Sequence, residues 1–144
     1  MIEQDTIKLL RECDAGAKMG IESIDEVLPY VQHKDMKDAL EDSENEHQLL
    51  EREIHQALNR YGDRGKDPAP IAETMSWLKT NVKLVMSESD KTIAELMTDG
   101  CDMGTKSLRR YLNQYKAADE DSKRIAEKLI RIEENLRTAM APML

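Results

Sequence analysis

One histidine in this sequence stands where it could bind a metal ion. His47 lies in the segment 36–61, whose apolar residues recur with the period of an α-helix and therefore share one face. Glu44 precedes it in the order Glu-x-x-His, which places the two side chains on neighbouring positions of that face. Carboxylate and imidazole together are ligands for iron or manganese. The alternative is a core imidazole that is hydrogen-bonded by Ser43, one turn earlier, or by a facing polar group.

A metal centre at His47 would need acids from elsewhere, and the candidates are Asp14, Glu51 and Glu133. Asp14 and Glu133 lie on the flanks of apolar helix faces and would have to turn inward, where an unpaired carboxylate is costly. A third arrangement uses His47, Glu51 and His55, spaced i, i+4 and i+8, as a one-sided zinc-type site completed by a partner subunit. We expect the structural role for His47, with no catalytic residue and no cofactor; iron or manganese is the alternative.

Composition and charge restrict the kinds of partner and the cellular compartment that we expect for this protein. The chain has 144 residues with 29 acidic against 21 basic side chains, a formal charge of −8, so we expect no nucleic-acid partner. No apolar run approaches the ~20 residues that span a bilayer, and the acidic first residues do not resemble a signal peptide. We therefore expect a soluble cytoplasmic protein without a membrane partner. Cys13 and Cys101 have no metal-binding spacing and are expected to be free, buried thiols.

Hydrophobic periodicity predicts an all-α protein with one domain, residues 1–144. Pro29 should distort the end of the first helix, and Gly62 should end the second. The expected helices cover residues 3–31, 35–61, about 70–86, 90–115 and 120–140, with a break near 87–91; one bent helix over about 70–115 is the alternative. They form a helical hairpin over 3–61, a linker and crossover with an extra short helix over 62–89, and a second hairpin over 90–141.

An internal repeat supports this layout. When the sequence is shifted by 84 residues, four residues of the first helix coincide with identical residues of the helix that begins near Asp90. The matching residues are Gly16, Met19, Gly20 and Ser23, and Gly100, Met103, Gly104 and Ser107. Glycine within a helix costs about 1 kcal/mol against alanine, so we expect these small residues to let two helices approach closely. Room for a ligand is the other interpretation.

Two hairpins joined by a long crossover, Glu-x-x-His in the second helix and the glycine-spaced segment 99–104 together resemble the ferritin-like superfamily, in particular its small uncharacterised bacterial domain proteins. The resemblance implies a ferritin-like four-helix bundle with an internal two-fold pseudo-repeat. Its di-metal members take one Glu from each of two helices and Glu-x-x-His from each of the others. Here Glu44 and His47 match that pattern, whereas the final helix has no histidine and Cys13 and Cys101 lie at the centres of the other two faces.

The resemblance therefore implies the fold and a degenerate metal site. We expect a non-catalytic bundle that acts by association, as a homo-oligomer that pairs through the crossover face around Trp77. The alternative is a di-iron or di-manganese carboxylate protein with storage or oxidase-type and peroxidase-type chemistry.

Overall fold

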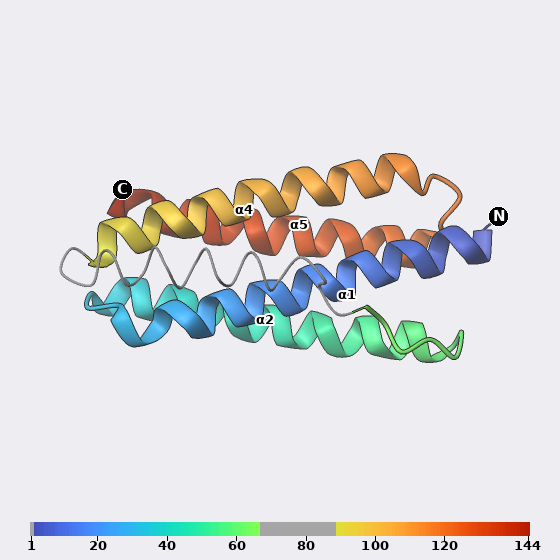
Figure 1. Ribbon diagram of the computed structural model, residues 1–144, viewed down its shortest axis with the longest axis horizontal. Helices are drawn as coiled ribbons and strands as arrows, with labels where there is room; N and C mark the ends of the chain where they lie inside the picture. The colour runs from blue at the N-terminus through green and yellow to red at the C-terminus, as the bar shows by residue number, and fades with distance from the viewer. Residues whose placement is uncertain (1, 67–88) are drawn as a thin grey trace.

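The computed structural model describes residues 2–66 and 89–144, and throughout these residues the regular structure is helical, with no strand. The long helices are α1 (Ile2–Val27), α2 (Lys34–Asn59), α4 (Ser89–Gln114) and α5 (Glu120–Met140). Figure 1 shows them side by side, with the α1–α2 hairpin against the α4–α5 hairpin. The prediction of an all-α protein is confirmed for this part of the chain. The expected helix near 70–86 and Trp77 lie outside the described residues.

The ends of these helices follow from local sequence. After Val27 the chain tightens into a short 3-10 helix, Leu28–Tyr30, because Pro29 cannot donate an intrahelical hydrogen bond. Shortly after the end of α2, Gly62 adopts a φ of +66°, a conformation that glycine tolerates best. A second 3-10 helix, Ala141–Met143, follows α5. The distorted turn at Pro29 and the stop at Gly62 are confirmed.

Side chains at both ends of the bundle fasten one hairpin to the other. At one end, Asp90 accepts hydrogen bonds from the backbone N–H groups of Gln32 and His33, both at 2.9 Å. At the other end, the hydroxyl of Thr6 accepts a hydrogen bond from the N–H of Asp119 at 2.8 Å. Because these bonds join the start of α4 and the start of α5 to the opposite hairpin, they set the register in which the four helices face one another.

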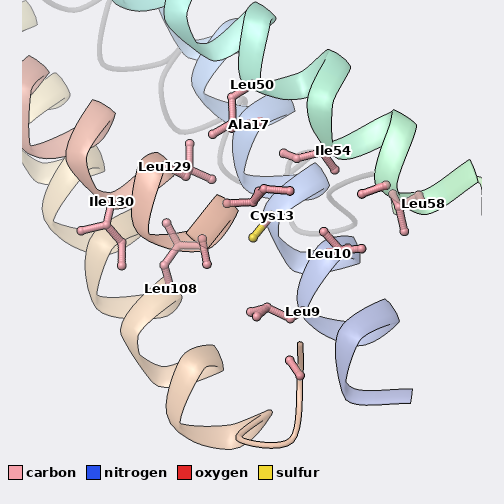
Figure 2. Packing of buried hydrophobic residues seen from close by; sticks show 14 residues of the cluster. Leu9, Leu10, Cys13, Ala17, Leu50, Ile54, Leu58, Leu108, Leu129 and Ile130 are labelled. Atoms are coloured by element: carbon pink, nitrogen blue, oxygen red, sulfur yellow. The ribbon is translucent and has the colours of Figure 1, made fainter. Parts of the chain in front are cut away.

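The apolar interior forms two clusters. Figure 2 shows the first, in which Cys13 lies among leucine and isoleucine side chains from α1, α2, α4 and α5. The second surrounds residues such as Ile24 and Leu40 and contains Cys101. Both thiols are free and buried, as the sequence predicts, and burial raises the pKa of each. In residues 2–66 and 89–144 no helix has the uninterrupted apolar length of a bilayer span.

A polar layer separates the two clusters. On α2, His47 comes between Leu40 of the second cluster and Leu50 of the first. On α5, Glu133 comes between residues of the same two clusters. Both side chains are buried, so each needs a partner inside the protein.

Candidate functional site

In the polar layer, His47 and Glu133 are hydrogen-bond partners of each other. The imidazole is fully buried, with Nδ1 2.7 Å from the carbonyl oxygen of Ser43 and Nε2 3.2 Å from Oε1 of Glu133. Burial by itself lowers the pKa of His47, but the hydrogen bond and charge of Glu133, together with the Ser43 carbonyl, raise it above its ordinary value. An imidazolium can donate to both acceptors, so both ring nitrogens are used within the protein.

Two glycines border this pair. The His47 ring lies against Gly20 of α1, where a Cβ atom would come within 2.5 Å of Nε2. Gly104 of α4 lies beside the carboxylate of Glu133, where a Cβ atom would make ordinary contact at 3.6 Å. Gly20 thus provides the space for the imidazole, a packing role toward a side chain that differs from the close approach of two helices that the glycine spacing predicts.

Glu44 has a different neighbour from the one its spacing suggests. Its partner is Asp25 of α1, and burial followed by the hydrogen bond and charge of Asp25 raises the pKa of Glu44 to about 7. Two carboxyl groups this close share a proton more readily than they both ionise. The Glu-x-x-His pair therefore diverges, with Glu44 on the α1 side and His47 turned to α5.

A second polar cluster lies on the α1–α2 seam. Nε2 of His55 is 3.0 Å from Oδ1 of Asp14 and 2.8 Å from Oε1 of Glu51. Within residues 2–66 and 89–144, these three form the only group of three or more His, Cys, Asp or Glu side chains whose ligand atoms all lie within 4.8 Å of one another. Burial, and then the hydrogen bond and charge of Asp14, raise the pKa of Glu51 to about 9.

The chain that follows α2 closes over this cluster. The N–H of Lys66 donates to Oδ2 of Asp14 at 2.8 Å, and the ammonium group of Lys18 lies 3.0 Å from the same oxygen. Burial alone would raise the pKa of Asp14, but these donors and Glu51 lower it. Two further ion pairs, Arg11 with Asp63 and Lys66 with Glu12, fasten the loop to α1.

A groove of about 620 Å³ lies between α1 and α4 and is largely apolar. His47 and Glu133 also line it. Its walls carry the residues that match in the internal repeat: Gly16, Met19, Gly20 and Ser23 on α1, and Gly100, Met103, Gly104 and Ser107 on α4. The groove is described from these walls, since residues 67–88 lie outside the described part of the chain.

The structure brings the predicted site residues together in two groups. His47 meets Glu133, and Asp14 meets Glu51, while Glu44 belongs to neither group. His55 joins Asp14 and Glu51, whereas the sequence places it with His47 and Glu51 in the one-sided arrangement. The second group could have been predicted from the register of the antiparallel hairpin that α1 and α2 form. If Gly20 faces His47, then Asp14 faces the stretch between Glu51 and His55.

No family model matches the chain, and searches of curated proteins and of solved structures find no match either. The site is therefore interpreted from its own geometry.

A structural role for His47 predicts that a conservative substitution lowers the free energy of unfolding only moderately. His47→Gln should lower the free energy of unfolding by about 1–2 kcal/mol, because an amide keeps part of the hydrogen bonding to Ser43 and Glu133. Urea denaturation followed by circular dichroism measures the change. His33→Gln, on an exposed residue before α2, is the control and should stay within about 0.5 kcal/mol of the wild type. Equal losses in the two variants would contradict this role.

Proposed function

We propose that this protein is a non-catalytic ferritin-like helical bundle that acts by association, as a homo-oligomer. The observation that supports a non-catalytic role is the hydrogen-bonded pair of His47 and Glu133 between two apolar clusters. A general acid or base must present a nitrogen or oxygen to a substrate. Here the ring nitrogens are used within the protein, by the Ser43 carbonyl and by Glu133. The pair positions α2 against α5.

The groove between α1 and α4 supports association with a second copy. In a two-fold dimer the same surface of each subunit meets its counterpart. The α1 wall and the α4 wall of the groove carry the same four residue types at the same spacing. Each wall can therefore make similar contacts with the second subunit. Met103 stands on one wall with 64% of its surface exposed, a large apolar side chain available for contact.

Sedimentation velocity over a range of protein concentrations tests self-association. We expect the wild type to form an oligomer and Met103→Lys to shift it toward the monomer, because a charge in an apolar contact must be desolvated. Leu49→Lys is a matched control, since Leu49 is 62% exposed but does not line the groove. A wild-type monomer at high micromolar concentration, or equal effects of the two lysines, would overturn association through this groove.

The alternative function is that of a di-iron or di-manganese carboxylate protein. The observation in its favour is that an acid of the final helix, Glu133, faces His47. Elemental analysis of protein from metal-replete cells distinguishes the two. We expect no metal that depends on Glu44 or His47, because those side chains turn to different helices. Two equivalents of iron or manganese, lost on Glu44→Ala or His47→Ala, would establish the alternative.

A further inference from the structure

We propose that Asp14, Glu51 and His55 bind one divalent transition-metal ion of the Zn²⁺ type, on the α1–α2 seam and apart from the polar layer of His47. The three side chains come from two helices that face each other in one hairpin. One imidazole nitrogen and two carboxylate groups are a ligand set that favours zinc and neighbouring transition ions over magnesium or calcium.

The first argument is that hydrogen bonding leaves this cluster incomplete. Two carboxylates converge on Nε2 of His55, which can donate only one hydrogen. Within residues 2–66 and 89–144, Oδ1 of Asp14 and Oε2 of Glu51 are buried and receive no hydrogen from an N–H donor, because the single hydrogen of His55 goes to Oε1 of Glu51; only the proton that Glu51 retains lies between the two acids. Asp14 is 0% exposed, and its Oδ1 lies 3.0 Å from Nε2 of His55, inside the cluster and away from water. A cation between the three groups would satisfy these oxygens together.

The second argument is one of size. Zinc lies about 2.0–2.2 Å from nitrogen and oxygen ligands, which places two ligands of a tetrahedral ion about 3.3 Å apart. The nitrogen of His55 is already 3.0 Å and 2.8 Å from the two carboxylate oxygens. The nitrogen of His55 and each of the two carboxylate oxygens therefore need to separate by only a few tenths of an ångström. The His55 side chain is 43% exposed, which leaves access for the ion and for water at a remaining position.

The third argument is that neighbouring groups of α1 and of the loop after α2 hold the carboxylate of Asp14 in place. Oδ2 of Asp14 accepts hydrogen bonds from the N–H of Lys66 and from Lys18, which leaves Oδ1 to face His55. Hydrogen bonds of this kind orient metal ligands in many sites. The ammonium group of Lys18 also repels a cation, so we expect binding of moderate affinity that the removal of this charge would strengthen.

Isothermal titration of the full-length chain with ZnCl₂ tests the site, with protein that carries no histidine tag and has been treated with a chelator. We expect one equivalent of Zn²⁺ to bind and Mg²⁺ not to bind. His55→Gln should weaken Zn²⁺ binding by at least about tenfold. His33→Gln, in a histidine outside the cluster, should leave binding unchanged. Lys18→Met should tighten it by roughly three- to tenfold.

Absorption of bound Co²⁺ gives a second reading of the same site, because its visible spectrum depends on ligand type and geometry. The spectrum should be lost in His55→Gln and kept in His47→Gln. Absence of Zn²⁺ binding, equal binding by wild type and His55→Gln, or loss of binding only in His47→Gln would each overturn the proposal. None of these outcomes depends on the oligomeric state, so the proposed function is tested separately.

Discussion

Gly20→Ala is expected to lower the free energy of unfolding by about 2–4 kcal/mol, although alanine in the middle of a helix is usually stabilising. The added Cβ atom would lie 2.5 Å from Nε2 and 2.6 Å from Cδ2 of His47. The imidazole is fully buried and hydrogen-bonded at both ring nitrogens, so moving it aside would break these bonds. Displacing it would strain the packing and leave Glu133 in the interior without its hydrogen-bond partner.

The repeat-related glycines are matched controls for this change. A Cβ atom at Gly104 would make ordinary contact with Glu133 at 3.6 Å, and at Gly100 it would meet no atom of residues 2–66 and 89–144 within 4 Å. Gly104→Ala and Gly100→Ala should therefore be neutral or stabilise the protein by up to about 1 kcal/mol. Urea denaturation of the three variants measures the differences. If Gly20→Ala proves as stable as Gly100→Ala, the contact between Gly20 and His47 is wrong.

Gly65→Ala should cost about 3 kcal/mol, because two penalties act at once. Gly65 has a φ of +87°, a conformation that costs other residues about 1–2 kcal/mol. A Cβ atom there would also lie 2.9 Å from the carboxyl carbon of Asp14. Relieving that overlap would push the loop away from α1 and break the hydrogen bond from the Lys66 N–H to Asp14.

The variant Gly62→Ala measures the conformational penalty without the steric one. Gly62 also has a positive φ, +66°, but a Cβ atom there would meet nothing within 4 Å in the part of the chain that the structure describes. This variant should therefore lose only the conformational cost of about 1–2 kcal/mol. Thermal and urea denaturation of both variants provide the comparison. Losses of the same size would show that the loop does not pack against Asp14 as described.

Much of the helical structure follows from the amino-acid sequence, because local rules determine it. The period of apolar residues predicts the four long helices of the described residues, α1, α2, α4 and α5, to within a few residues. Pro29 and Gly62 act through backbone geometry that needs no distant partner. The burial of His47 follows in the same way, since it lies on an apolar stripe.

The pairing of the polar side chains required the tertiary structure. Spacing along one helix puts Glu44 and His47 on neighbouring positions, but the helices packed on either side decide where each turns, to Asp25 and to Glu133. The cluster of Asp14, Glu51 and His55 depends on the register between α1 and α2, which the short connection between these helices and their packing determine. A helix period specifies a direction around one axis, whereas a binding site needs the distance between two axes, and only packing determines that distance.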